Sequence, residues 1–146
     1  MSAARSMPRS RDDYRHFIPI TTRLADNDLY NHLNNATYYS FIDTAVTLYL
    51  TKAVGRDLGN DPVVYFVAEN GCVYFGSIAF PDDVVCGLVV SHIGTSSMRF
   101  EVGLFRNDER LEAARGYFVQ VCCDRATQRP IPMPRAVRAA LEAIKA

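Results

Sequence analysis

One uninterrupted segment, residues 36–53 (ATYYSFIDTAVTLYLTKA), constrains the fold of this chain more than any other. It contains neither Gly nor Pro. Its apolar residues recur at spacings of three and four, at Tyr38, Phe41, Ile42, Ala45, Val46 and Tyr49. This periodicity predicts a helix with one apolar face. At 1.5 Å per residue the helix would be about 27 Å long, with Asn34 or Asn35 as its N-cap and Gly55 as its C-terminal stop.

The segments after this helix carry strand patterns instead. Residues 97–106 (SMRFEVGLFR) alternate between apolar and polar or small side chains, which is typical of a half-buried strand. Residues 84–93 (VVCGLVVSHI) are apolar on both faces, which indicates a central strand buried on both sides. Further strands are predicted over residues 14–24, over 63–80 with a bend or break near Asn70-Gly71, and over 111–123. A short helix, 135–145, is predicted to end the chain.

The predicted order is therefore a strand, one long helix and several strands joined by short turns. Short connections favour antiparallel neighbours, and the apolar face of one helix needs one sheet to cover it. We predict an α+β fold in which an antiparallel sheet curls around one central helix. With 146 residues the chain makes a single domain. We place this domain at 14–146, after a flexible, Arg- and Ser-rich leader at 1–13.

Charge, apolar runs and cysteine content exclude several classes of function. Sixteen Lys and Arg balance sixteen Asp and Glu, so no net field attracts nucleic acid or an anionic membrane. The apolar runs stay far below the ~20 residues that span a bilayer. Zero net charge also favours self-association.

Cofactors and metals are not expected either. Glycine-rich phosphate-binding motifs are absent, the three histidines are scattered, and the four cysteines form no C-x-x-C pair. We expect free, buried thiols, which favour a cytoplasmic location.

A polar segment directly before the predicted helix is the candidate site. Residues 23–35 (RLADNDLYNHLNN) combine two carboxylates, a histidine and several asparagines. The first N–H groups of a helix are unpaired and carry partial positive charge, so they can hold an oxyanion. A carboxylate beside them can act as a base or a nucleophile. The alternative interpretation is a capping loop rich in turn-forming residues.

The segment from Arg23 to Tyr38 (RLADNDLYNHLNNATY) resembles a known signature. It is similar to that of the hotdog-fold acyl-CoA thioesterases of the 4-hydroxybenzoyl-CoA thioesterase type. There an R-x-x-D-x-D motif ends the first strand, and an H-V-N-N-x-x-Y element opens the central helix. Residues 69–74, 94–101 (GTSSMRFE) and 129–134 (RPIPMP) are similar to further parts of that family. The resemblance covers about residues 14–140 and implies a hotdog fold and thioester hydrolysis.

The same resemblance implies roles for individual residues. Asp28 aligns with the catalytic carboxylate, which attacks the thioester carbonyl or activates water. The backbone N–H of Asn35 would polarise the carbonyl oxygen, and His32 matches a histidine implicated in catalysis in some relatives. Asp26 is expected to form an ion pair or a cap. Glu69 lies where some relatives carry a second acid, the alternative being an ordinary strand charge at the surface.

Substrate contacts and partners are the remaining expectations. Ser97 and Arg99 are candidate contacts for coenzyme A phosphates, since Arg pairs well with phosphate, or they form an ordinary solvated strand face. An acyl-carrier-protein thioesterase and a non-catalytic acyl-CoA-binding or sensing module remain as alternatives. Edge strands and the doubly apolar segment 84–93 favour self-association. We expect a homodimer or homotetramer with the active site at the subunit interface.

Overall fold

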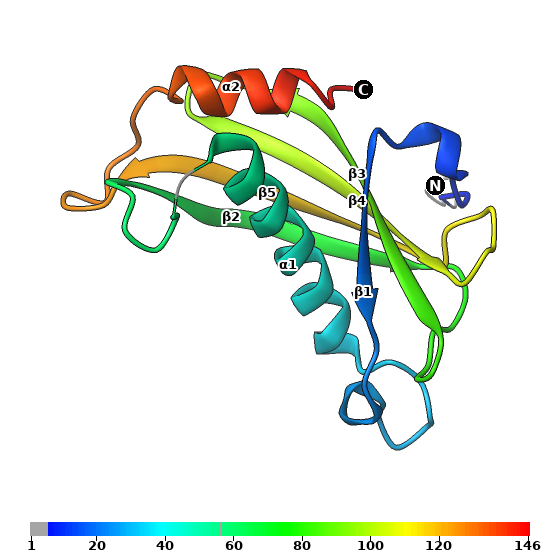
Figure 1. Cartoon of the computed structure of the whole chain (residues 1–146). Coiled ribbons are helices and arrows are strands. Elements are labelled where there is room, and N and C mark those ends of the chain that lie inside the picture. Colours follow the sequence, from blue (N-terminus) through cyan, green and yellow to red (C-terminus); the bar gives the residue numbers. More distant parts are fainter. Residues whose placement is uncertain (1–5, 56) are drawn as a thin grey trace, which may run out of the picture.

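A five-stranded antiparallel sheet curls around one long helix (Figure 1). The computed structural model describes residues 6–55 and 57–146. In chain order the elements are η1 (Arg11–Asp13), β1 (His16–Thr21), η2 (Leu24–Asp26), α1 (Asn35–Val54), β2 (Val63–Tyr74), β3 (Asp83–Ile93), β4 (Ser97–Arg106), β5 (Ala114–Asp124) and α2 (Arg135–Glu142). The strand order is β1-β3-β4-β5-β2, so β1 and β2 form the edges of the sheet. The predicted α+β architecture is confirmed.

The long helix α1 lies where the apolar periodicity predicted it. All six apolar residues of the predicted face are buried, with exposures of 0–7%. Asn34 is the N-cap, and its side chain accepts a hydrogen bond of 2.9 Å from the N–H of Ala36. Gly55 ends the helix at φ 68°, in the left-handed region that glycine adopts without strain. Both ends of α1 are therefore fixed by local residues.

Two strands differ from the prediction. β2 runs unbroken past Asn70-Gly71 and ends at Tyr74, with a bulge between Val67 and Glu69. Residues 75–80 lie outside the strands. β5 begins at Ala114 rather than at 111, because Leu111 forms a bridge with Ser10 near the N-terminus. Pairing with β5 extends from Val63 to Tyr74 and thus accompanies the whole of β2, and such pairing with a distant segment leaves no local signal in the sequence.

The N-terminal part of the chain covers the outer face of the sheet, which is the face turned away from α1. Tyr14 is 4% exposed and lies over Gly87 and Gly103, which pair across β3 and β4. A Cβ atom at Gly103 would lie only 2.6 Å from Cζ of Tyr14, so the ring needs glycine there. The Tyr14 hydroxyl donates a hydrogen bond to the buried carboxylate of Glu112. Its ring packs edge-on against Phe105, with the ring centroids 5.6 Å apart.

This packing corrects one step of the sequence argument. β3 is indeed buried on both faces, and Val89 on its outer side is only 2% exposed. The sequence argument assigned part of that burial to a second copy of the chain, whereas Tyr14 and Phe105 of the same chain supply it. Of the predicted leader, residues 1–5 lie outside the described residues, and residues 6–13 hold η1 and the bridge from Ser10 to Leu111.

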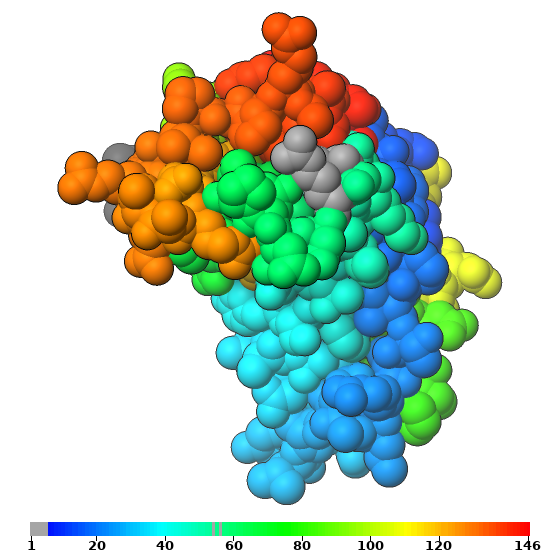
Figure 2. Space-filling view, turned by 60° about the vertical axis from the view of Figure 1, so that its left-hand side comes forward, coloured from blue at the N-terminus to red at the C-terminus, as the bar shows by residue number. Residues whose placement is uncertain are grey.

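The opposite side of the sheet carries α1. Figure 2 shows the surface of α1 between the N-terminal region and the segments around β2 and β5, with the loop before α1 projecting beyond the end of the helix. No described helix is long and apolar enough to cross a membrane. All four cysteines are free, and burial raises the pKa of the Cys122 thiol to about 11.

Candidate active site

The loop that joins β1 to α1 is held at its base by Asp26. This carboxylate is 3% exposed and forms an ion pair of 2.9 Å with Arg23. Burial alone would raise its pKa, but hydrogen bonds from the side chain and N–H of Arg23, together with the positive charge, lower it. The Asp26 carbonyl also accepts a 2.8 Å hydrogen bond from Asn34 N–H. Asp26 therefore forms the ion pair that the sequence predicted, and it also fixes the loop against the start of α1.

Asp28 is fixed by the backbone of its own loop. Its Oδ1 atom accepts hydrogen bonds from the N–H groups of Tyr30 (2.8 Å) and His32 (3.2 Å). Its own N–H donates to the His32 carbonyl at 2.7 Å. The second oxygen, Oδ2, accepts no hydrogen bond from the described residues. One carboxylate oxygen thus orients the side chain, and the other is available for chemistry.

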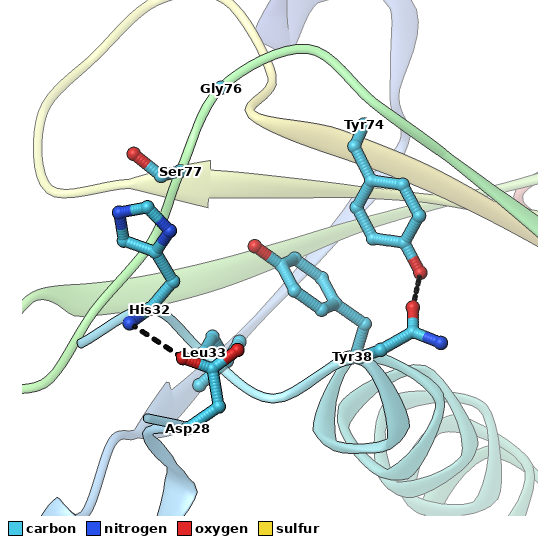
Figure 3. A pocket seen from close by; sticks show the side chains of 8 residues that line it. Asp28, His32, Leu33, Tyr38, Tyr74, Gly76 and Ser77 are labelled. Carbon is cyan, nitrogen blue, oxygen red and sulfur yellow. Dashed lines mark hydrogen bonds between the residues drawn. The ribbon is translucent and has the colours of Figure 1, made fainter. Parts of the chain in front are cut away.

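The start of α1 offers a second unpaired group. Asn34 occupies the N–H groups of Ala36 and Thr37 with its side chain and carbonyl oxygens. The N–H of Asn35 has no hydrogen-bond acceptor among the described residues. The Asn35 side chain instead accepts a hydrogen bond from the Tyr74 hydroxyl at the end of β2 (Figure 3). This contact connects the first turn of the helix to the edge strand.

These groups line one pocket of about 340 Å³, and its lining residues are Asp28, His32, Leu33, Asn35, Tyr38, Tyr74, Gly76 and Ser77. In Figure 3 the His32 ring lies next to Ser77, with the Tyr38 ring between it and Tyr74. The Tyr38 and Tyr74 rings pack edge-on with centroids 4.9 Å apart. Burial raises the pKa of both hydroxyls, so these tyrosines stay neutral hydrogen-bonding groups.

The structure brings together three residues that the sequence predicted, Asp28, His32 and Asn35. Sequence reasoning missed Tyr74, Gly76 and Ser77, which follow about forty residues later in the chain. No spacing or motif joins them to the loop. They reach the pocket because the chain leaves β2 at Tyr74 and because Leu33 N–H bonds to the Ile78 carbonyl at 2.7 Å.

Glu69 and Arg99 lie outside this pocket. The side chains of β4 that join the main core are those of Met98, Phe100 and their alternate neighbours, so Arg99 is on the outer face of the sheet. Its guanidinium lies over the Tyr117 ring, 4.0 Å from the centroid. Glu69 pairs with Val119, an outer-face residue of β5, and is exposed. Both side chains therefore point away from α1.

Ser97 is also remote within one chain. It begins β4, whereas Leu104 lies at the end nearer the pocket and pairs with Ala114, the partner of Tyr74. Leu104 lies seven residues after Ser97 along the strand, which corresponds to about 23 Å at 3.3 Å per residue. A ligand that touched both ends would need to be long and extended.

The pocket has the parts of an acyl-transfer site. Asp28 and Asn35 line the same space; the carboxylate of the first can act as base or nucleophile, and the unpaired backbone N–H of the second can stabilise an oxyanion. Within the described part of the chain, no group of three His, Cys, Asp or Glu side chains is placed to hold a metal ion.

A family model described as the thioesterase-like superfamily matches residues 22–141. None of the curated protein sequences matches the chain. Among solved structures, the chain is 41% identical to the PA5185 protein from Pseudomonas aeruginosa strain PAO1, with a TM-score of 0.93 over 96% of this chain and 98% of that one.

Two thioesterases share the fold at lower identity. One, from Thermus thermophilus, was crystallised with coenzyme A and Zn. It is 29% identical, with a TM-score of 0.77 over 91% of this chain and 96% of that one. The other is Slr0204, a 1,4-dihydroxy-2-naphthoyl-CoA thioesterase from Synechocystis. It is 14% identical, with a TM-score of 0.77 over 86% of this chain and 93% of that one.

The family model spans most of the chain, and the structural likeness extends over nearly all of it. The predicted hotdog fold and the predicted thioesterase resemblance are confirmed, without distinguishing the 4-hydroxybenzoyl-CoA type from other members. The chain belongs to the thioesterase-like superfamily and is a thioester hydrolase.

Proposed function

We propose that this chain hydrolyses acyl-CoA thioesters to the free acid and coenzyme A in the pocket between Asp28 and Asn35. One observation carries the proposal: Asp28 Oδ2 and Asn35 N–H both lack a hydrogen-bond partner among the described residues, and Asp28 and Asn35 line the same pocket. The coenzyme A bound to the similar Thermus thermophilus thioesterase supports this choice of thioester.

In the water route, Asp28 acts as a general base. Its carboxylate removes a proton from water, and the resulting hydroxide attacks the thioester carbonyl carbon. The carbonyl oxygen becomes an oxyanion that accepts a hydrogen bond from Asn35 N–H. When the tetrahedral intermediate collapses, the C–S bond breaks, and the proton held by Asp28 passes to the departing thiolate. The products are the carboxylic acid and the thiol.

In the covalent route, Asp28 attacks the carbonyl carbon itself. The C–S bond then breaks to release the thiolate, which takes a proton from solvent, and a mixed anhydride remains on Asp28. Water hydrolyses this anhydride and restores the carboxylate. Asn35 N–H serves both tetrahedral intermediates. In either route His32 contributes through its backbone N–H, which orients Asp28, while its ring borders the substrate.

Substrate contacts beyond the reacting atoms are also part of the proposal. Arg99 and Ser97 would meet coenzyme A phosphates only if the nucleotide crossed to the outer face of the sheet. Arg99 has the required guanidinium, which pairs with phosphate in a bidentate fashion. Glu69 would act as a second acid only toward a site in another copy, since it is exposed on the edge strand β2.

A second copy of the chain is proposed to complete the site. The edge strand β2 exposes apolar side chains along its length (Phe66, Val67, Val73 and Tyr74, at 42–45%). Next to the pocket, Leu29 is 97% exposed and Tyr30 is 79% exposed. Pairing of two β2 edges would extend the sheet and cover these residues. We therefore propose a homodimer through β2.

Replacement of Asp28 tests the hydrolytic function. Asp28→Asn should lower kcat/KM for acyl-CoA by about 10²–10⁴, the usual contribution of a general base, with unchanged unfolding. Asp108→Asn, an exposed carboxylate in the turn between β4 and β5, is the matched control. Release of thiol is followed across short, long and aromatic acyl-CoAs and the same acyl groups on acyl carrier protein. Tight acyl-CoA binding without any turnover would instead identify a binding module.

Isotope labelling separates the two routes. A single turnover in ¹⁸O-labelled water is followed by mass spectrometry of the peptide that contains Asp28. The covalent route places ¹⁸O in the Asp28 carboxylate whenever water attacks its anhydride carbon. It can also place the label only in the product acid, so a search for the acyl-enzyme itself, by mass spectrometry of the quenched wild-type protein, complements the measurement. Label in the product alone, with no acyl-enzyme, supports the water route.

A further inference from the structure

A second pocket lies in the groove between α1 and the α1-facing side of β2 and β5. It measures about 330 Å³, and its lining includes Asp43, Thr47, Leu50, Tyr65, Val67 and Gln120. We call it the Gln120 pocket. Gln120 is 4% exposed, and its amide oxygen is the one buried side-chain nitrogen or oxygen of the described residues that has no hydrogen-bond partner.

A buried amide without a partner is costly. Leaving one buried polar group unsatisfied costs about 1–3 kcal/mol relative to a paired one. The neighbours of Gln120 on the same face of β5, Phe118 and Cys122, are apolar and belong to the main core. An apolar residue would therefore fit this face better unless something in the pocket binds the amide. A hydroxyl group suits it in either orientation of the amide, because a hydroxyl both donates and accepts.

The position of this pocket relative to β2 connects it with the active site. β2 is an edge strand, and the Gln120 pocket lies at its beginning, at Val64, Tyr65 and Val67. The candidate active-site pocket, which Asp28 and Asn35 line and which we call the Asp28 pocket, lies at the other end of β2, at Tyr74. If two β2 strands pair antiparallel about their midpoint, Val63 of one copy lies opposite Tyr74 of the other. The Gln120 pocket of one copy then adjoins the Asp28 pocket of its partner.

We propose that the Gln120 pocket receives the far end of the acyl group whose thioester lies at Asp28 of the partner copy, and that Gln120 selects an acyl group carrying a hydroxyl. This inference rests on the proposed hydrolysis and on the proposed dimer. Leu50 and Val67 provide apolar surface for the carbon atoms of the acyl group, and Gln120 provides the polar end point.

Matched acyl-CoA pairs test the inference. The pairs are hexanoyl and 6-hydroxyhexanoyl, octanoyl and 8-hydroxyoctanoyl, and phenylacetyl and 4-hydroxyphenylacetyl. Wild type should prefer the hydroxylated member of at least one pair by about tenfold or more in kcat/KM, because its hydroxyl satisfies the buried amide. Gln120→Met, which keeps the length of the side chain without its amide, should bring that ratio to about one by slowing the hydroxylated substrate only.

The outcomes separate the two proposals. If wild type releases coenzyme A from no member of any pair, the proposed hydrolysis fails. If it hydrolyses both members of every pair at similar rates, the hydrolysis stands and the Gln120 inference is overturned, with water as the ordinary occupant of the pocket. This comparison needs only wild type, so it remains decisive if Gln120→Met fails to fold. A preference that survives in a folded Gln120→Met also overturns the inference.

Discussion

The outer face of the sheet and its β2 edge differ in how far they are covered by the rest of the chain. On the outer face, Tyr14 fills the space above Gly87 and Gly103, and its hydroxyl bonds to Glu112. At the β2 edge, Phe66 and Val73 are each 44% exposed, and no described strand of the same chain pairs with that edge. One surface is covered within the chain, whereas the other stays exposed, and we propose that a second copy covers it.

The candidate site lies beside the exposed β2 edge, because Tyr74 at the end of β2 lines its pocket. Asp28 and Asn35 present unpaired groups to a pocket whose surroundings include the exposed Leu29 and Tyr30. These two unpaired groups lie where we propose that substrate and a second copy bind. Because the covered outer face and the candidate site are separate, we expect substitutions on the outer face to alter stability and substitutions beside the β2 edge to alter function.

The largest expected effect is a loss of stability on the outer face of the sheet. Tyr14→Ala should lower the free energy of unfolding by about 3–5 kcal/mol, as for other large aromatic truncations, because it leaves a cavity and a buried carboxyl without its partner. Urea unfolding measures the loss. Tyr30→Ala, which removes a tyrosine that is 79% exposed, is the matched control and should change the free energy by less than about 0.5 kcal/mol. Equal losses of unfolding free energy in Tyr14→Ala and Tyr30→Ala would contradict the difference between the covered outer face and the exposed loop.

A charge on the open edge should break the dimer rather than the fold. Phe66→Lys places an unpaired charge in each half of the proposed interface, and we expect dissociation to weaken hydrolysis by about 10²-fold, since burying a charge without a partner is costly. Size-exclusion chromatography with light scattering measures the assembly. Leu111→Lys changes an apolar residue of similar exposure (50%) away from this edge and should remain dimeric. A wild type that is monomeric at micromolar concentration would contradict the proposed interface.

The N-cap beside the site should have a moderate effect. Asn34→Ala removes the acceptor for Ala36 N–H and should cost about 1 kcal/mol of unfolding free energy. Asn34→Gly, which many helices tolerate as a cap, should cost only a few tenths of a kcal/mol. Thermal or urea unfolding of the two variants checks the difference. Similar losses in both would show that Asn34 acts through contacts other than its cap.

The smallest expected effect is a change in the pH dependence of stability. Burial raises the pKa of Glu112 above its ordinary value of 4.5, although bonds from Tyr14 and Arg9 and the charge of Arg115 oppose this. The folded state thus binds a proton that the unfolded state has lost, and this contribution to stability disappears as pH rises through the folded pKa. Glu112→Gln should therefore gain stability relative to wild type as pH rises above 4.5, the ordinary pKa of the carboxyl. A flat or falling difference in urea unfolding would contradict the shift.

Local patterns determined much of the fold from the sequence alone. The apolar spacing of residues 36–53 predicted α1 to within one residue at each end, because a helix is built from neighbouring residues. The strict alternation of residues 97–106 predicted β4 with its observed bounds. Asp28, His32 and Asn35 were likewise predicted together, since one loop and one helix turn carry all three.

Tertiary structure decided what depends on distant segments. Tyr74 and Ser77 enter the pocket because β2 ends beside the helix N-terminus, and Tyr14 covers β3 because Gly87 and Gly103 pair beneath it. The amide oxygen of Gln120 is buried without a partner, and residues of α1 and β2 line the same pocket as Gln120. The sequence determined which elements form and which loop holds the carboxylate, through contacts between near neighbours. Only packing between segments far apart in the chain decided which surfaces are closed, which are open, and what faces the substrate.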